Sequence, residues 1–306
     1  MSPSDSRTQS VVPRPAAIPF YPGIAPFAAR YDGFVLDLWG VIHDGISPYP
    51  GVADTLGRLK RLQKRVILLS NAPRRAAEIV SAMARKMAID PELYDELISS
   101  GEAAYWALRR RDEPFFANLG RKCYLMGPTR DHGMLGGLDL HRVERMEEAE
   151  FILATGVDWD DDKLDIYEPA LAVGAKKRLP MICANPDLVV IRGGKRVLCA
   201  GTLARRYEEL GGVVRYFGKP YPPIYELCFA HMGIAERARI VAIGDSLRTD
   251  IAGAEAAGID AVLVTGGIHA EELGIAHGEH PDPQALAEAC ARAGHIPIAA
   301  IPAFVW

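Results

Sequence analysis

The sequence predicts an α/β protein with a doubly wound parallel sheet and an inserted α/β cap domain. Three observations lead to this fold class: short apolar runs that do not alternate with polar residues, helical patterns between them, and a middle segment with strand patterns of its own. Continuously apolar runs are typical of strands buried on both faces of a parallel sheet. Their alternation with helices indicates βαβ units.

Four apolar runs are the predicted strands of the main sheet, and each ends at a polar residue or a glycine. They cover residues 34–36, 66–69, 240–243 and 261–264. Helices are predicted between them, for example over 76–86 and 250–257. In such sheets ligands bind beyond the carboxyl ends of the strands, so we expect Asp37, Ser70 and Asp245 to lie together.

The predicted domain organisation has three parts within the 306 residues. Residues 1–27 contain many Pro and Ser residues and no sustained period, which indicates an N-terminal arm that is either flexible or lies along the surface. The core domain is predicted over 28–103 and 213–306. The intervening segment, 104–212, has its own strand and helix patterns and is long enough for a separate cap domain.

Composition limits the partners and the location of the protein. A formal charge of −4 and a pI near 6.1 give no basic excess, so we expect no nucleic-acid partner. The five cysteines occur singly, which suits a reducing compartment. The sequence shows neither a signal peptide nor an apolar stretch that could span a membrane. We therefore expect a cytoplasmic protein without membrane attachment, and a homo-oligomer is compatible with the sequence.

Two aspartates follow the third predicted strand in the segment Gly-Asp245-Ser-Leu-Arg-Thr-Asp250. Carboxylates at this spacing across a strand-to-helix turn can face one point, and Mg²⁺ prefers such hard oxygen ligands. A turn aspartate followed by a helix N-cap would give the same pattern. Taken alone, the segment leaves both interpretations open.

Three other positions carry residue types suited to phosphoryl chemistry. Asp37 ends the first strand, where a carboxylate can attack phosphorus. Lys219, between a glycine and a proline, can screen a carboxylate and a phosphate together. Ser70 and Asn71 offer a hydroxyl and an amide to a phosphate oxygen. Each has an ordinary alternative as a turn residue, a surface lysine or a helix cap.

The order of these segments along the chain resembles the four motifs of the haloacid dehalogenase superfamily, over about residues 31–267. The size and place of the insert are similar to class IIA members with a C2 cap. That branch contains p-nitrophenyl phosphatases and sugar and nucleotide phosphatases. The glycine-rich run 40–51, the Ala-Asn-Pro-Asp step 184–187 and the tail 265–273 also resemble this branch.

The resemblance implies a role for each motif residue and Mg²⁺ as the cofactor. Asp37 would be both nucleophile and metal ligand, and Lys219 would neutralise charge beside it. Ser70 and Asn71 would hold the phosphate. The implied metal site comprises Asp37, the backbone carbonyl of Trp39, Asp245 and, as an outer carboxylate, Asp250. Candidate cap residues for substrate contact are Asn185 and Asp187, with Tyr167, Arg192 and His132 as further candidates.

Trp39 departs from the resembled pattern, which usually has a second aspartate here as general acid and base. An indole cannot donate that proton, and losing such a group typically costs about 10²–10⁴ in rate. Three explanations stay open: His43 or Asp44 substitutes, the leaving group needs little protonation, or the chain has another role. For His43 we favour the alternative of a residue on the surface of the flap.

The sequence therefore predicts Mg²⁺-dependent hydrolysis of a small phosphorylated metabolite through an aspartyl-phosphate at Asp37. One alternative is a slow or inactive protein that binds a phosphoryl ligand, which Trp39 favours. The other is a carbon–halogen hydrolase that uses the same nucleophile. Asp245 and Asp250 argue against the dehalogenase, because halide displacement needs no Mg²⁺.

Overall fold

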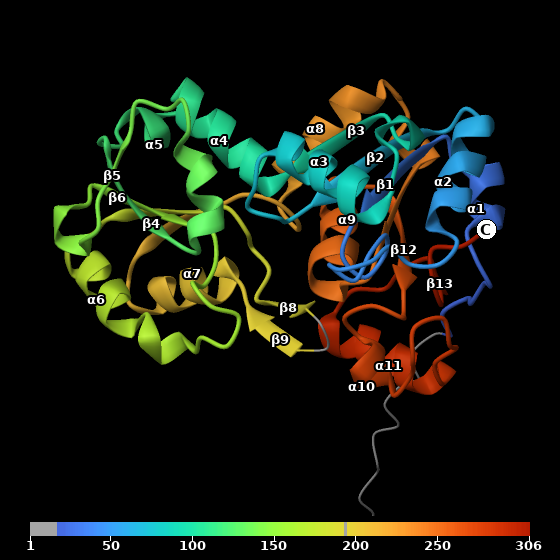
Figure 1. Ribbon diagram of the computed structural model, residues 1–306. Helices are drawn as coiled ribbons and strands as arrows, with labels where there is room; N and C mark the ends of the chain where they lie inside the picture. Colours follow the sequence, from blue (N-terminus) through green and yellow to red (C-terminus); the bar gives the residue numbers. More distant parts are fainter. Residues whose placement is uncertain (1–16, 193–194) are drawn as a thin grey trace, which may run out of the picture.

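The computed structural model describes residues 17–192 and 195–306 and shows two α/β domains side by side, a core and a cap (Figure 1). The doubly wound parallel core and the inserted α/β cap confirm the predicted fold class. Most of the predicted N-terminal arm, residues 1–16, lies outside the described residues.

The core sheet is parallel throughout, in the order β13-β12-β11-β1-β2-β3. Its strands are β1 (Gly33–Asp37), β2 (Arg65–Ser70), β3 (Glu96–Ser99), β11 (Ile240–Gly244), β12 (Asp260–Val264) and β13 (Ala299–Ile301). Strand β1 lies in the interior of the sheet with β2 on one side and β11 on the other. This order places the ends of the motif-bearing strands next to one another.

Helices cover both faces of the core sheet because alternate residues of each strand point to opposite faces. On one face, Phe34 and Leu36 pack with α1 (Ala25–Arg30), α2 (Val52–Arg61) and α3 (Ala76–Met87). On the other face, Val35 and Ile67 pack with α8 (Pro222–Met232), α9 (Ala252–Ala257) and α11 (Pro283–Ala293). Each fully buried Leu or Ile side chain contributes about 1.5–3 kcal/mol of transfer free energy. The apolar runs in the sequence are therefore explained by burial on two sides.

The cap has its own parallel sheet, in the order β10-β7-β6-β4-β5. Its strands are β4 (Lys122–Met126), β5 (His141–Arg142), β6 (Phe151–Ala154), β7 (Pro180–Cys183) and β10 (Val213–Tyr216), and its longer helices are α6 (Glu168–Lys176) and α7 (Ala200–Glu209). The predicted core domain resumes at residue 213. Strand β10 begins at that residue, but it pairs with β7 and so extends the cap sheet. The short, half-exposed run of β10 lacks the apolar continuity that marks the other strands.

An antiparallel hairpin, β8 (Val189–Arg192) with β9 (Lys195–Leu198), extends from the cap towards the core (Figure 1). The chain enters the cap through α4 (Ser100–Arg110) and α5 (Pro114–Ala117) and returns after β10. Ser99 caps α4 by accepting a hydrogen bond from the Glu102 N–H at 3.0 Å. The predicted helix over 250–257 begins as a π-helical turn, Leu247–Ile251, before α9.

Residues 17–27 belong to the range predicted as an arm, but they pack against the core. Phe20 forms a β-bridge with Ala300, and the N–H of Ile24 donates to the Val305 carbonyl at 2.8 Å. Ile24 is fully buried and α1 begins at Ala25. Isolated Ile and Phe side chains between prolines show no period, so this packing could not be seen in the sequence pattern.

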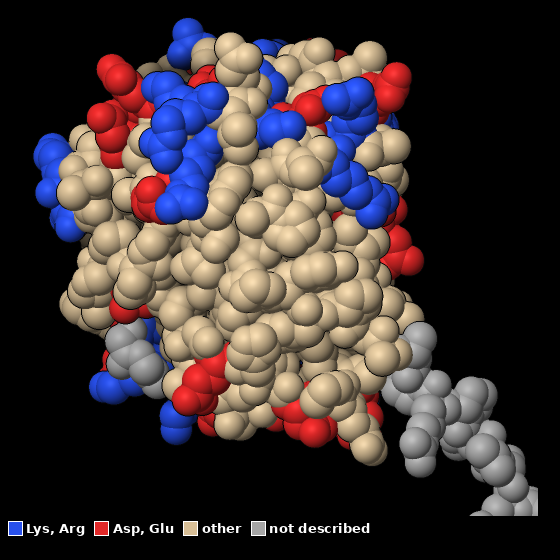
Figure 2. Space-filling model, turned by 90° about the vertical axis from the view of Figure 1, so that its right-hand side faces the viewer, with Lys and Arg blue, Asp and Glu red and all other residues tan. Residues whose placement is uncertain are grey.

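Figure 2 shows the side of the core that carries α1 and α2. Its centre is broad and uncharged, and Lys and Arg lie in separate groups at the margins beside Asp and Glu. In the described part of the chain, no helix has the length and apolar character needed to cross a membrane.

Candidate active site

The predicted motif residues meet at the carboxyl edge of the core sheet. Asp37 ends β1, Ser70 ends the neighbouring strand β2, and Asp245 follows β11 on the other side. Neighbouring strands lie only about 4.8 Å apart, which brings their ends within reach of one ion. Carboxylate oxygens of Asp37, Asp245 and Asp250 all lie within 4.8 Å of one another, and all three residues are buried.

Lys219 lies between two of these carboxylates. Its Nζ is 2.5 Å from Asp37 Oδ1 and 2.7 Å from Asp250 Oδ1, and it also donates to the Leu69 carbonyl at 3.3 Å. The backbone is fixed by Asn71, whose Oδ1 accepts the Lys219 N–H at 2.8 Å and whose Nδ2 donates to the Lys219 carbonyl at 3.1 Å. The lysine, only 2% exposed, is therefore held in one position.

Gly218 allows the Lys219 backbone to lie close to the Asn71 side chain. Its φ of +108° lies in a region that other residues avoid, and a Cβ atom here would lie 2.4 Å from Asn71 Oδ1. Because the Lys219 segment and the Asn71 segment touch at this point, the glycine sets the distance between them.

The charge balance of the cluster is unfavourable without a further cation. Burial, and then the charge of Asp250, raise the pKa of Asp37 to about 7, although Lys219 opposes the shift. Burial and the charges of Asp37 and Asp250 raise the pKa of Asp245 well above its usual value. For Lys219, burial opposes the charged form, but Asp250 and Asp37 outweigh it and raise its pKa. Three carboxylates against one ammonium fit a divalent cation with oxygen ligands.

Backbone groups orient the two aspartates that follow β11. Asp245 Oδ2 accepts the Ile268 N–H at 2.7 Å, and Asp250 Oδ2 accepts the Ser246 N–H at 3.1 Å. No hydrogen bond to the carbonyl of Trp39 is found among the described residues, which leaves that oxygen free for a ligand. Gly40 (φ +76°) lies so close to Asp245 that a Cβ would be 1.9 Å from Oδ2. The donor set is thus compact and composed of hard oxygens.

The cap closes over this edge through the segment 184–187. Asn71 Nδ2 donates to Asp187 Oδ1 at 2.8 Å, and Ser100 Oγ donates to the Ala184 carbonyl at 2.5 Å. Arg248 donates to the Pro186 carbonyl at 2.9 Å. Asn185 is buried and its Oδ1 accepts the Asp187 N–H at 3.1 Å. Of the predicted cap residues, Asn185 and Asp187 therefore lie at the core–cap contact.

A cavity of about 300 Å³ opens between the core edge and the cap. Its lining includes Asp37, Trp39, Ser70, Asn71, Asn185, Asp187 and Arg192. A smaller hollow of about 210 Å³ shares Asp37, Trp39 and Asp187 with it and adds Asp245 and Asp44. Tyr167 and His132 line neither hollow: Tyr167 packs in the cap core and His132 contacts Arg142.

The indole of Trp39 is half-buried between the core and the hairpin. Its ring meets the His43 ring edge-on at 5.3 Å, and the Arg192 guanidinium lies 5.8 Å from its centre. A Cβ on Gly45 would lie 2.1 Å from the indole, so that glycine makes room for it. Trp39 thus fills space between the domains and offers no group that can transfer a proton to a leaving group.

The structure separates the two residues that the sequence offers as replacement acids. His43 is buried and lines neither hollow, and its Nδ1 accepts the Gly45 N–H at 3.0 Å. Burial, together with the charge of Arg74, lowers its pKa to about 4. Asp44 is exposed and lines the smaller hollow. Burial opposes its ionisation, but the backbone N–H groups, chiefly those of Ser47 and Ile46, together outweigh burial and lower the pKa of Asp44.

Four charged or hydroxyl-bearing residues that line the larger hollow were not predicted from the sequence: Arg74, Arg130, Asp131 and Thr155. Arg74 stands three residues beyond Asn71, outside the Ser-Asn pair that the motif marks. Arg130 and Asp131 lie in the cap 3-10 helix Thr129–Leu135, and Thr155 follows β6; these cap segments have no fixed spacing from the motifs. Proximity in the fold is the signal that finds them.

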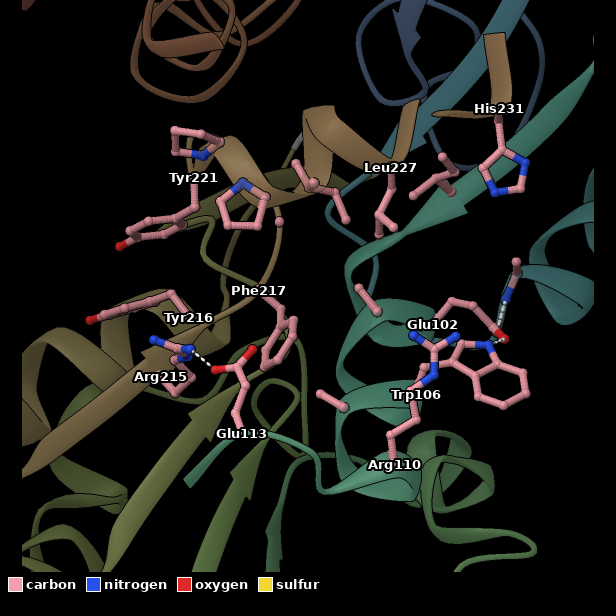
Figure 3. A pocket seen from close by; sticks show the side chains of 18 of the residues that line it. Glu102, Trp106, Arg110, Glu113, Arg215, Tyr216, Phe217, Tyr221, Leu227 and His231 are labelled. Atoms are coloured by element: carbon pink, nitrogen blue, oxygen red, sulfur yellow. Dashed lines mark hydrogen bonds and ion pairs between the residues drawn. The ribbon is translucent and has the colours of Figure 1, made fainter. Parts of the chain in front are cut away.

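A larger groove of about 780 Å³ lies between α4 and the segment that leads from β10 into α8 (Figure 3). Figure 3 shows Trp106 and Arg110 on one wall and Tyr216, Phe217 and Tyr221 on the other. None of the three clustered carboxylates lines it. Its size alone therefore does not make it the catalytic pocket.

The fold and site define a two-domain α/β protein with a buried carboxylate and lysine cluster under a cap. The haloacid dehalogenase-like hydrolase family model matches residues 34–141, and a HAD-hydrolase-like model matches 216–290. A solved hydrolase of the haloacid dehalogenase-like family from Brucella suis 1330 is 31% identical, with a TM-score of 0.78, over 93% of this chain and 100% of that chain.

Curated relatives agree. The 4-nitrophenylphosphatase of Schizosaccharomyces pombe is 25% identical over 266 residues, covering 80% of this chain and 87% of that protein. Chronophin of Bos taurus is 26% identical over 276 residues, covering 82% and 88%. The chain belongs to the haloacid dehalogenase-like hydrolase family. The resemblance inferred from the motifs, including that to class IIA phosphatases, is confirmed.

Proposed function

We propose that the chain is a phosphatase that hydrolyses a small phosphomonoester through an aspartyl-phosphate on Asp37 and depends on Mg²⁺. The contact between Asp37 and Lys219, 2.5 Å long and buried beside two further carboxylates, is the observation that carries this proposal. Phosphatases among the curated relatives support the reaction class. We assign residues 17–103 with the segment after β10 to the core domain and the insert between them to the cap.

The proposed reaction has two steps. A carboxylate oxygen of Asp37 attacks phosphorus, the ester P–O bond breaks, and the alcohol leaves after taking a proton. Water then attacks the phosphorus of the acyl phosphate, which releases inorganic phosphate and regenerates Asp37. Lys219 keeps the Asp37 carboxylate oriented and offsets negative charge on the phosphoryl group, while the Ser70 hydroxyl and the Asn71 backbone N–H hold its oxygens.

Asp37, the Trp39 carbonyl and Asp245 would hold the Mg²⁺ directly, with Asp250 orienting the site and Lys219. The bound ion supplies positive charge that lets two anions approach each other. The donor set fits this role because the excess negative charge of the cluster is buried. Asn185 and Asp187 close the site from the cap and exclude water around the phosphoryl group.

The test is a screen of several dozen metabolite phosphates with Mg²⁺, with EDTA, and with the Asp37→Asn variant. We expect turnover that EDTA removes and that falls below a tenth in Asp37→Asn, because the amide is nearly isosteric but not nucleophilic. Halide release from haloacids that persists in EDTA would instead assign a dehalogenase.

Trp39 favours a second candidate, a protein that binds a phosphoryl ligand and turns it over slowly or not at all. The indole lines both hollows where a proton-transferring carboxylate is expected, and His43 lines neither. Tight Mg²⁺-dependent binding of a phosphorylated ligand without phosphate release over hours would favour this candidate.

A further inference from the structure

Arg74 lines the 300 Å³ cavity that contains Asp37, and its guanidinium has no hydrogen-bond or ion-pair partner among residues 17–192 and 195–306. Its neighbour Arg75 differs: it donates to both Glu102 oxygens at 2.7 and 2.9 Å and lies 3.5 Å from the Tyr105 ring centre. A half-buried cation without a partner is unfavourable, and burial accordingly lowers the pKa of Arg74. Arg75 therefore has an anionic partner within the part of the protein that the structure describes and Arg74 does not, which indicates that an anion from outside the chain binds Arg74.

The backbone at Arg74 is held in place. Ser99 Oγ donates to the Arg74 carbonyl at 2.6 Å, and a Cβ on Gly101 would lie 2.3 Å from the Arg74 nitrogen. The first turn of α4 therefore packs directly on this loop. An arginine anchored in this way presents its charge to the cavity without a large loss of backbone entropy.

Two guanidinium groups in this part of the cavity have no ion pair among the described residues. Arg130 lines the same hollow and has no ion pair within the described ranges, while Asp131 is the buried carboxylate beside them. Arg192 is already paired with Asp160 at 2.6 Å. Asp131 and the exposed Glu78 are the carboxylates near these groups, and neither forms an ion pair with Arg74 or Arg130 in the described part of the chain.

The charges that act most strongly on Arg74 are those of Asp131, Arg130, Glu78 and Arg192. None of these belongs to the cluster around Asp37. Arg74 lines the larger hollow with cap residues and does not line the smaller hollow that contains Asp245, and this position favours contact with the leaving group over contact with the phosphoryl group.

We propose that the substrate carries a second anionic group, a carboxylate or a second phosphate on its leaving group, and that Arg74 binds it. This inference rests on the proposed phosphatase function. Arginine pairs with carboxylates and phosphates in a bidentate manner, which fixes the ester bond relative to Asp37. The cavity volume of about 300 Å³ favours a compact leaving group of a few carbon atoms.

The experiment compares three substrates of similar length: glycerol 3-phosphate, whose leaving group is neutral, 3-phosphoglycerate, which adds a carboxylate, and propane-1,3-diol bisphosphate, which adds a phosphate. We expect the wild type to show a higher kcat/KM for at least one of the two substrates with a second anionic group than for glycerol 3-phosphate. Arg74→Gln should reduce that preference about 10- to 100-fold, the range for loss of a charged hydrogen bond. Arg74→Lys should restore part of it.

Arg85→Gln is the matched control, because Arg85 is exposed on α3 and lines none of the hollows described above. Its substrate preference should equal that of the wild type. An equal loss on all three substrates in Arg74→Gln would assign the arginine to the phosphoryl group and overturn the inference. So would a wild type that prefers glycerol 3-phosphate, even if Arg74→Gln does not fold.

Binding to Asp37→Asn separates failure of this inference from failure of the proposed function. If no phosphomonoester is hydrolysed, calorimetric titration of the same three compounds still measures the preference. Tighter binding of 3-phosphoglycerate or of the bisphosphate than of glycerol 3-phosphate would support the Arg74 site, even though the phosphatase assignment would then be wrong. Equal binding of all three would contradict the site itself.

Discussion

The Arg192 guanidinium of the cap lies 5.8 Å from the centre of the Trp39 ring in the core. The residue that stands where related phosphatases carry a proton donor is therefore in contact with the hairpin that closes the site. Trp39 therefore connects the position of the expected acid to the cap hairpin.

The absence of an acid at Trp39 should be visible in the choice of leaving group. A phenolate leaves unaided, whereas an alkoxide needs a proton, so p-nitrophenyl phosphate should be cleaved far faster than an alkyl phosphate of similar size. The second step lacks its base as well, so nitrophenol should appear in a burst before slow turnover. Stopped-flow absorbance measures both effects.

Trp39→Asp should then accelerate cleavage of alkyl esters, provided that the space left by the indole does not collapse. The matched control is Asp44→Asn, because Asp44 is the candidate acid that lines the smaller hollow. A wild type with shallow leaving-group dependence and no burst, combined with a large loss in Asp44→Asn, would show that Asp44 already performs this role.

The two aspartates after β11 should differ in their effect on metal affinity. Asp245→Asn removes a proposed direct ligand, whereas Asp250→Asn removes a carboxylate that pairs with Lys219 at 2.7 Å. We expect the loss of Mg²⁺ affinity to be larger for Asp245→Asn, with about 10- to 100-fold for Asp250→Asn. Titration calorimetry measures both, and equal affinities would contradict the proposed ligand set.

Gly218→Ala should impair catalysis by moving Lys219. The added Cβ would lie 2.4 Å from Asn71 Oδ1 at a φ of +108°, so the segment must shift. We expect kcat to fall by at least tenfold, since displacement of a catalytic group by about 1 Å can cost about 10² in rate. Gly211→Ala is the control, because Gly211 also has a positive φ (+84°) but no atom within 4 Å of an added Cβ. It should lose about 1 kcal/mol of stability and keep its activity.

His43 should contribute to the pH dependence of stability. Burial and Arg74 lower its pKa in the folded state to about 4, below the usual value of 6.5. Between these values the unfolded chain binds more protons, so stability present above pH 6.5 is lost as the pH falls towards 4. The free energy of unfolding of the wild type relative to His43→Gln should therefore decrease by about 1–3 kcal/mol from pH 7 to pH 4. Urea unfolding at several pH values measures this, and a constant difference would contradict it.

The sequence predicted the parts of the fold in which burial leaves a pattern. Strands β1, β2, β11 and β12 are apolar on both faces and were found with the correct order of polar residues at their ends. Strand β10 was not assigned to the cap, because its residues are only half-buried and one sheet edge is exposed. The packing of residues 17–24 on the core could not be predicted, because it depends on single side chains such as Ile24.

The residues of the site also fall into those that the sequence predicted and those that it did not. Asp37, Asp245 and Lys219 are fixed by the ends of strands and by a short motif, so their spacing in sequence reflects their spacing in the fold. Arg74 and Arg130 reach the cavity through loop and cap geometry, which no spacing records. The burial of His43 could not be predicted from the sequence. Its position suggested the surface of a flap, but the side chain is buried and the Trp39 ring packs against it edge-on.

The groove in Figure 3 lies where the chain crosses between the domains, along α4 and along the segment from β10 to α8. The β8–β9 hairpin lies on the side of the cap that faces the core, apart from these crossings (Figure 1). A body that rotates about two neighbouring connections moves least at the connections and most at its far end. If the cap rotates about these crossings, the hairpin would shift against the core, so a change in groove width would alter access to Asp37. Side chains of the groove, such as Phe217 and Leu227, would then govern substrate entry without meeting the substrate.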